Sequence, residues 1–148
     1  MSITIPPEVS TFLSAQPEMG SSEQVIPLLT VDSQGFPHAC LLSRAQLDAT
    51  DTEIRAAITS WGTRSNIRNN GVALILVTLG ETVHHLKLGV IRAHDEKKVL
   101  LVAFEPVEYK ADTLGIAVHP MTFTAGPWIS SLEHWDETRI MLRSLDHA

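Results

Sequence analysis

Apolar residues in the middle of the chain recur with the spacing of β-strands, and short polar segments separate them. The segment 32–37, DSQGFP, has the composition of a tight turn, and Asp95 and Glu96 join the last two apolar segments. The pattern predicts strands over 25–31, 38–42, 53–59, 72–78, 82–94 and 98–109. Six strands with local connections and few helices predict a mainly β fold, a small antiparallel barrel.

Burial is expected to differ between these strands. In the third strand, Ile54, Ala56 and Ile58 alternate with polar or small residues, so we expect one buried face. The run VALILVT at 72–78 is continuously apolar, which is typical of a strand covered on both faces. Gly89 lies inside the next strand and suits a bulge or a sharp bend of a closing barrel.

Helical periodicity is confined to the two ends of the chain. Near the N-terminus, PPEVSTFLS places Val9, Phe12 and Leu13 on one face of a short helix. Near the C-terminus, apolar residues at helical spacing predict a helix over 128–145 that packs on the barrel or on a second subunit; they are Trp128, Ile129, Leu132 and Trp135. The pattern assigns no element to 111–127.

The length of the chain limits the number of domains. Its 148 residues, 44% of them hydrophobic, suffice for one ordinary domain and are too few for two. We therefore expect a single domain over 1–148, with an N-terminal arm over 1–24, the barrel over 25–110 and the C-terminal helix after it.

Charge and apolar run length narrow the class of partner. The formal net charge is −6, whereas phosphate-rich partners favour a positive field, so we expect neither nucleic-acid nor membrane binding. The longest uncharged apolar run, GVALILVTLG, has about half of the roughly 20 residues that a membrane helix needs. The N-terminus has no secretory signal pattern, and the lone Cys40 cannot form an internal disulfide. These features favour a cytoplasmic protein in which any basic site is local.

One segment, TSWGTRSNIRNNG at 59–71, is cationic and rich in hydroxyls within this acidic chain. Thr63 is a candidate N-cap and Gly71 suits the residue that follows a helix, so we expect about two helical turns over 63–69. Unpaired N–H groups and the Arg64 guanidinium, flanked by the hydroxyls of Thr63 and Ser65, form a pattern that binds phosphate monoesters. Solvated surface is the alternative interpretation of the same residues.

The order of the segments adds a resemblance. LLTVDSQGFPHACLLS, then a strand, then SWGTRSNIRNNGVALILV resembles the pyridoxamine 5′-phosphate oxidase-like family of FMN-binding split barrels, from about Val25 to Glu108. The resemblance implies a six-stranded antiparallel split β-barrel with short flanking helices. It also implies a homodimer that holds FMN in a groove between its two identical subunits, with the FMN phosphate at the helix over 63–69.

The resemblance also implies a set of cofactor-binding residues. Residues of LLS (41–43) and ITSW (58–61) match strand ends that run along the ribityl chain and the isoalloxazine ring: Leu42, Ser43, Ile58, Thr59, Ser60 and Trp61. Residues of the helix match the phosphate-binding positions: Thr63, Arg64, Ser65 and Asn66.

The sequence also departs from the oxidase at several positions. Ser43 and Ser65 stand where that enzyme usually carries basic residues, and Arg44 is a candidate replacement for the missing charge. No counterpart of its substrate-holding C-terminal Trp/Arg segment is visible. The departures argue against oxidation of pyridoxine or pyridoxamine phosphate.

The histidines and the cysteine form no metal-binding pattern. His84 and His85 are adjacent on a strand and must point to opposite faces; one of them, for which we take His85, is a candidate for the flavin edge, and a structural role for both is the alternative. Cys40 has the strand parity of His38 and Leu42, as expected of a buried, inert thiol. The other histidines show no zinc-like spacing, so we expect no metal site.

The sequence singles out no catalytic residue, which suits a protein whose cofactor carries the chemistry. We therefore expect an FMN-dependent oxidoreductase that acts on a small molecule. Two alternatives come from other classes: a non-catalytic, dimeric split-barrel binding module, and a heme or deazaflavin binder on the same fold.

Overall fold

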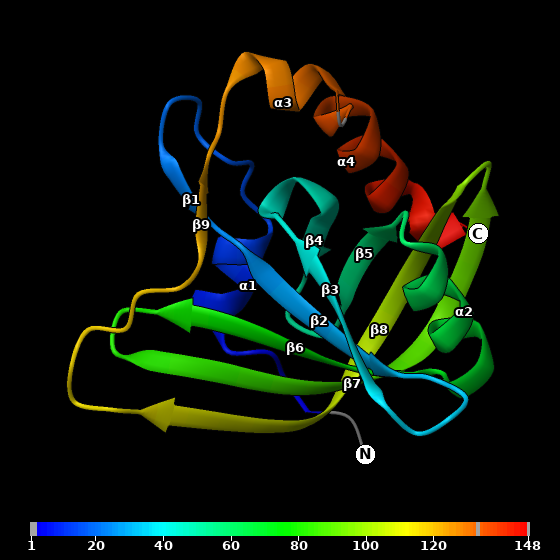
Figure 1. Ribbon diagram of the computed structural model, residues 1–148, viewed down its shortest axis with the longest axis horizontal. Coiled ribbons are helices and arrows are strands. Elements are labelled where there is room, and N and C mark those ends of the chain that lie inside the picture. The colour runs from blue at the N-terminus through cyan, green and yellow to red at the C-terminus, as the bar shows by residue number, and fades with distance from the viewer. Residues whose placement is uncertain (1–2, 133, 148) are drawn as a thin grey trace.

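The computed structural model describes residues 3–132 and 134–147. Its main sheet is antiparallel, with the strand order β3-β2-β6-β7-β8-β5-β4 (Figure 1). The strands of this sheet are β2 (Ile26–Val31), β3 (Pro37–Leu42), β4 (Leu47–Ala49), β5 (Ile54–Ile58), β6 (Val72–Leu79), β7 (Thr82–Glu96) and β8 (Val99–Thr113). A separate pair joins β1 (Ser22–Gln24) to β9 (Thr122–Thr124).

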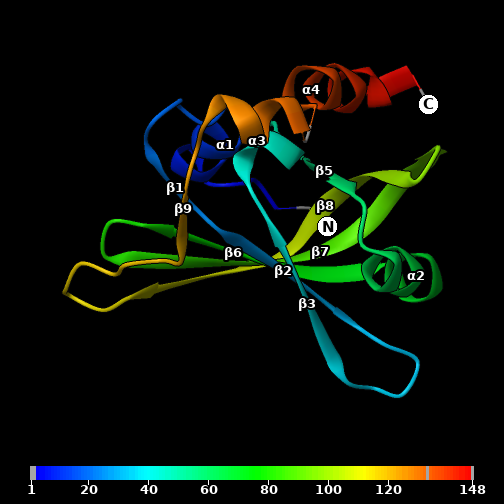
Figure 2. The same cartoon turned by 45° about the horizontal axis from the view of Figure 1, so that its top comes forward.

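The main sheet curls into a half-open barrel whose edge strands are β3 and β4 (Figures 1 and 2). The predicted split barrel is confirmed, with seven strands instead of six because the short β4 pairs with β5. The long strands β7 and β8 shift register between Lys87 and Leu88 and again between Val90 and Arg92. Gly89 lies between these two irregularities, which is consistent with the bulge or bend predicted in this part of the strand.

The barrel encloses one main apolar core, which includes Leu28, Ile54, Ile75, Leu86 and Phe104. All six predicted strands form, with bounds close to those expected, because a strand with one face on the core repeats its apolar residues with period two. The helix α1 (Pro7–Leu13) also forms where it was predicted and buries Val9 and Leu13.

The expected burial of two strands was wrong in opposite directions. In β5 every residue is buried, because Ala57 packs against Leu101 and Leu142 on the face away from the main core. In β6 only alternate residues are buried, and Val72 is 49% exposed. The continuous apolar run of β6 therefore leaves one face only partly covered by this chain.

The single helix predicted over 128–145 was also wrong. Two helices stand there, α3 (Pro127–Leu132) and α4 (Trp135–Arg143), followed by the 3-10 turn η2 (Ser144–His147). His134, before α4, has φ 52°, a left-handed conformation that a continuous helix does not contain, and residue 133 lies outside the described residues. Trp135 is buried, whereas Trp128 is 73% exposed and does not share its packed face.

The helix α4 packs on the barrel of its own chain. Arg139 on α4 donates hydrogen bonds to Asp48 Oδ1 of β4 at 2.9 Å and to the carbonyl of Ser14 at 3.0 Å. Arg55 of β5 donates to the carbonyl of Leu142 at 3.2 Å. Within the described part of the chain, no helix combines the length and the apolar character that crossing a bilayer would need.

Candidate functional site

The helix α2 (Trp61–Asn70) follows β5 directly and contains the predicted phosphate-binding residues. It begins at Trp61 with Ser60 as its N-cap residue, so the prediction that Thr63 is the N-cap was wrong. Thr63 lies in the first turn, and its fully buried side chain faces Cys40 of β3. The predicted end is confirmed, because Gly71 has φ 69° and its N–H donates to the carbonyl of Ile67 at 2.9 Å.

The hairpin of β2 and β3 fixes α2 in place. The buried Asn66 donates from Nδ2 to Thr30 Oγ1 at 3.0 Å, and Asn70 donates to the carbonyl of Val31 at 2.6 Å. A Cβ placed on Gly62 would lie 3.3 Å from Cε1 of His38, so the imidazole packs against the first turn of the helix. The Asn66 amide, predicted to contact the cofactor, is bound to the barrel.

The start of α2 presents hydrogen-bond donors that the fold does not use. The first helical hydrogen bond runs from the Arg64 N–H to the Ser60 carbonyl at 3.0 Å, so the N–H groups of Trp61 and Gly62 precede it. Across residues 3–132 and 134–147, the Arg64 guanidinium meets no carboxylate, and its Nε is buried without a hydrogen-bond partner. By contrast, Arg68 one turn later pairs with Asp95 of β7.

Cys40 lies beside Thr63 and is partly buried. Burial raises the pKa of its thiol, and the Thr63 hydroxyl partly opposes this by lowering it. A thiol with a raised pKa is protonated at neutral pH and is a poor nucleophile. The predicted full burial was wrong, because the Cys40 side chain is only partly covered.

An apolar pocket opens at the other end of β3. It has a volume of about 360 Å³, and we call it the apolar pocket; its lining includes Leu41, Leu42, Ser43, Gln46, Phe123 and Trp128. Ser43 caps the turn η1 (Arg44–Gln46), since its Oγ accepts from the Ala45 N–H at 3.2 Å and its N–H donates to Gln46 Oε1 at 3.1 Å. The predicted residues Leu42 and Ser43 therefore lie at this pocket.

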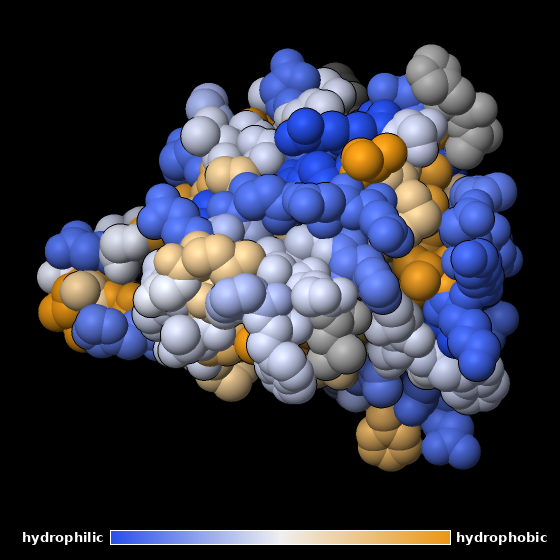
Figure 3. Space-filling view, turned by 90° about the horizontal axis from the view of Figure 1, so that it is seen from above, coloured by the Kyte–Doolittle hydropathy of each residue, from blue (hydrophilic) through white to orange (hydrophobic). Residues whose placement is uncertain are grey.

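A larger cavity with a mixed polar and apolar lining lies next to it. This cavity, the charged cleft, has a volume of about 600 Å³ and is lined by the end of β5, the tip of the β7–β8 hairpin and one side of α4 from Glu137 to Met141. The predicted residue Thr59 lines it, Ile58 before it is fully buried, and Gln46 lines both cavities. Seen from the side of α3 and α4, patches of apolar surface show between polar atoms (Figure 3).

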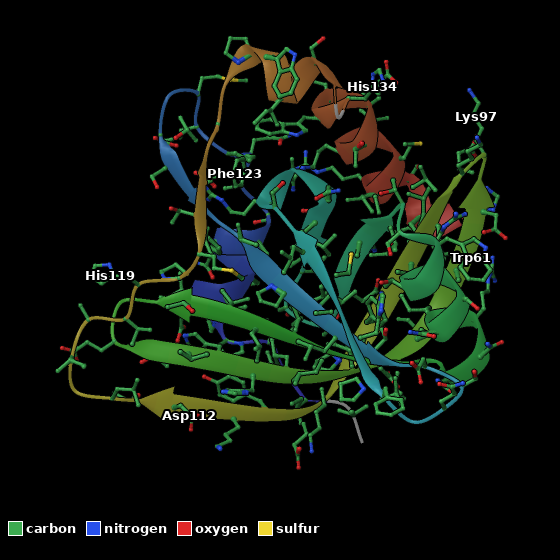
Figure 4. The ribbon with its side chains drawn as sticks, viewed as in Figure 1. Trp61, Lys97, Asp112, His119, Phe123 and His134 are labelled. Carbon is green, nitrogen blue, oxygen red and sulfur yellow. The ribbon has the colours of Figure 1, made fainter. Side chains whose placement is uncertain are left out.

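Arg44 and His85, two residues considered for the cofactor site, lie away from α2. Arg44, the candidate replacement for the missing basic residue, pairs with Glu23 at 2.8 Å and lies over the Phe12 ring, so it does not supply a charge to the site. His85 Nε2 lies 2.8 Å from Asp112 Oδ2. Asp112 is at the far end of β8 from Trp61 (Figure 4), so one chain does not bring His85 together with α2.

The neighbouring histidine has a structural environment. His84 is buried, and its Nδ1 lies 2.7 Å from the Tyr109 hydroxyl. Burial lowers the pKa of the His84 imidazole, which favours its neutral form. The two histidines point to opposite faces of β7, as predicted.

Two residues of the site were missed from the sequence, His38 and Gln46. The strand parity that His38 shares with Leu42 indicates an inward direction, but not contact with Gly62. Gln46 lies in the polar segment between the predicted strands 38–42 and 53–59, where no spacing indicates a position between two cavities.

Comparison with known proteins identifies the fold. No family model and no curated protein sequence matches the chain. The styrene monooxygenase flavin reductase of Pseudomonas putida S12 is 9% identical, with a TM-score of 0.55, over 71% of this chain and 88% of that one. An FMN-binding protein of Syntrophomonas wolfei subsp. wolfei is 16% identical, with a TM-score of 0.51, over 60% of this chain and 77% of that one.

A third structure connects to the resemblance seen in the sequence. A candidate pyridoxamine 5′-phosphate oxidase of Lactobacillus delbrueckii is 13% identical, with a TM-score of 0.50, over 59% of this chain and 84% of that one. At such identities the likeness is one of fold.

Proposed function

We propose, from the premise that this chain is a split barrel of the type found in flavin-binding proteins, that it binds FMN and acts as an FMN-dependent oxidoreductase on a small molecule. The observation that carries the proposal is the unpaired Arg64 guanidinium at the start of α2. In a chain with a net charge of −6, an arginine without a carboxylate partner is available to an anionic ligand.

The phosphate of FMN fits the donors at the start of α2. The free N–H groups of the first turn and the positive end of the helix dipole favour a dianion. Arg64 adds a planar fork that donates two parallel hydrogen bonds, and the partly exposed Ser65 hydroxyl is a further donor. His38 beside Gly62 fixes the helix start.

The apolar pocket suits the flavin ring. Strand β3 leads from His38, next to the helix start, to Leu42 at the pocket, a rise of about 13 Å at roughly 3.3 Å per residue. FMN likewise carries its charged phosphate and its largely apolar ring at opposite ends of the ribityl chain. Flavins supply hydride and electron transfer when bound, and these residues would position the ring and limit access of water.

We also propose that two copies of the chain enclose this groove. Large apolar side chains are exposed near it, among them Phe36 at 64%, Leu41 at 56% and Trp61 at 77%. Exposed apolar surface of this kind marks interaction sites, and a second copy would cover the partly exposed face of β6 as well. Light scattering at micromolar concentration should give twice the chain mass; a monomer would contradict the proposed groove.

The absorbance spectrum and a titration test the cofactor. Purified protein with bound FMN should show two bands, in the near ultraviolet and the blue, and FMN should bind more tightly than riboflavin because only FMN carries the phosphate. Equal affinity for the two would contradict a phosphate site at α2. A single intense near-violet band would indicate heme, and a protein that takes up no chromophore would be a binding module.

A further inference from the structure

The charged cleft has a composition that the FMN proposal does not use. Its apolar lining residues, which we call the floor, are buried or half-buried: Ala57 of β5, Val99 of β8 and Met141 of α4. Exposed charged and polar residues also line the cleft, and we call them the rim: Glu96, Lys97, His134 and Glu137. An apolar floor with a few polar groups around it is the usual form of a small-molecule site.

Two opposite charges at the rim have no partner in the fold. Glu96 lies 3.3 Å from His94, but Lys97 and Glu137 form no ion pair or side-chain hydrogen bond with any residue of the described ranges. They come from different walls of the cleft, Lys97 from the tip of the β7–β8 hairpin and Glu137 from the first turn of α4. The cleft therefore offers one cation and one anion to a ligand.

The backbone conformation gives a second, independent indication that the charged cleft is a binding site. Among the described residues, Lys97, with φ 59°, and His134, with φ 52°, are the non-glycine residues with positive φ. Both line the charged cleft, Lys97 from the tip of the β7–β8 hairpin and His134 from the segment before α4 (Figure 4). Lys97 opens a two-residue hairpin loop, a position where glycine is the ordinary residue at positive φ. Local strain of this kind collects at functional sites.

We propose that the charged cleft binds a small zwitterion of the amino-acid class with an apolar side chain. Glu137 receives the ammonium group, Lys97 receives the carboxylate, and the floor of Ala57, Val99 and Met141 contacts the side chain. A ligand with both charges satisfies both rim residues, whereas a simple cation or anion leaves one of them unpaired. Binding requires no flavin; only the role of this ligand as the second substrate rests on the proposed function.

Three matched ligands test the proposal by calorimetry on the full chain. L-Phenylalanine carries both charges, phenethylamine lacks the carboxylate, and 3-phenylpropionate lacks the ammonium group. L-Phenylalanine should bind at least tenfold more tightly than either of the others. Equal affinities, or no binding of L-phenylalanine at millimolar concentration, would overturn the proposal.

Single-residue variants test which rim residue binds the carboxylate of the ligand and which binds its ammonium group. Lys97→Gly should abolish the preference for L-phenylalanine over phenethylamine while raising the melting temperature, because glycine relieves the positive φ. Lys97→Arg should restore the preference. Glu137→Gln should abolish the preference over 3-phenylpropionate.

The neighbouring charges serve as controls. Lys98→Gln and Asp136→Asn remove the same charges from adjacent residues that do not line the cleft, and should bind L-phenylalanine as the parent does. Parent-like binding by Lys97→Gly or Glu137→Gln would contradict the assignment. Arg64→Ala separates the two sites, since it should weaken FMN binding and leave L-phenylalanine binding unchanged.

Discussion

The arginines of α2 and of α4 lie in contrasting surroundings. Arg139 on α4 has a side chain that is only 6% exposed, and it donates hydrogen bonds to Asp48, Ser14 and Arg44. Burial lowers the pKa of its guanidinium, and the charge of Asp48 opposes this by raising it. Arg64 on α2 reaches no such partner in the described structure. The first arginine belongs to the fold, and the second is available to a ligand.

The largest effect is expected at Arg139. Arg139→Met keeps an apolar stem but leaves Asp48 without its 2.9 Å partner and two carbonyls without their donor. Removing one partner of a buried ion pair costs about 3–5 kcal/mol, and chemical denaturation should show a loss of that size. The matched control is Arg143→Met, whose side chain is 62% exposed and lies 3.4 Å from Asp48. Equal free energies of unfolding for the two variants would contradict the assignment of Arg139 to the fold.

The second-largest effect is expected at Arg64, and it concerns FMN binding and not folding. Arg64→Ala should weaken FMN binding at least about tenfold, since a hydrogen bond to a charged group contributes about 1.5–3 kcal/mol and a decade corresponds to about 1.4 kcal/mol. Its free energy of unfolding should stay within about 0.5 kcal/mol of the parent, because the substitution breaks no hydrogen bond or ion pair of the described structure. Fluorescence titration with FMN and denaturation together check it. A large loss of stability would make Arg64 a structural residue.

Six strands, β2, β3 and β5 to β8, could be predicted from the sequence, whereas the short strands β1, β4 and β9 and the partners of the arginines could not. The alternation of apolar residues in the six strands is a local pattern, whereas three residues are too few to show it. Arg139 and Asp48 are far apart in the chain, and only the docking of α4 on β4 brings them together. No local pattern distinguishes Arg139 from Arg64, so the sequence cannot indicate which arginine is free.

The errors at α2 and α4 have different physical causes. Thr63 has the chemistry of an N-cap, but its side chain is buried against β3, and the helix begins two residues earlier. Before α4, His134 adopts a left-handed conformation that the apolar spacing around it does not indicate. At Thr63 tertiary packing overrides a local preference, and at His134 one backbone conformation interrupts the helix that the spacing predicts.

A third prediction extends the contrast to an unpaired lysine. Lys97 contacts no carboxylate in the described structure and has φ 59°, so Lys97→Gly should stabilise the fold by about 1 kcal/mol. Thermal unfolding measures the change. A lower melting temperature would mean that Lys97, like Arg139, stabilises the fold.

The smallest effect is expected at Arg68, which lies on the same helix as Arg64 but has a partner. Arg68 pairs with Asp95, and their side chains are 45% and 63% exposed, so solvent and salt screen the pair. Arg68→Ala should change stability by about 0–1 kcal/mol and FMN affinity less than Arg64→Ala, because the guanidinium lies one turn farther from the helix start and is already engaged. The same titration and denaturation measurements check both. If Arg68→Ala weakens FMN binding as much as Arg64→Ala does, the phosphate responds to the total charge of α2. The distinction between a paired and an unpaired arginine would then fail at the site where it matters most.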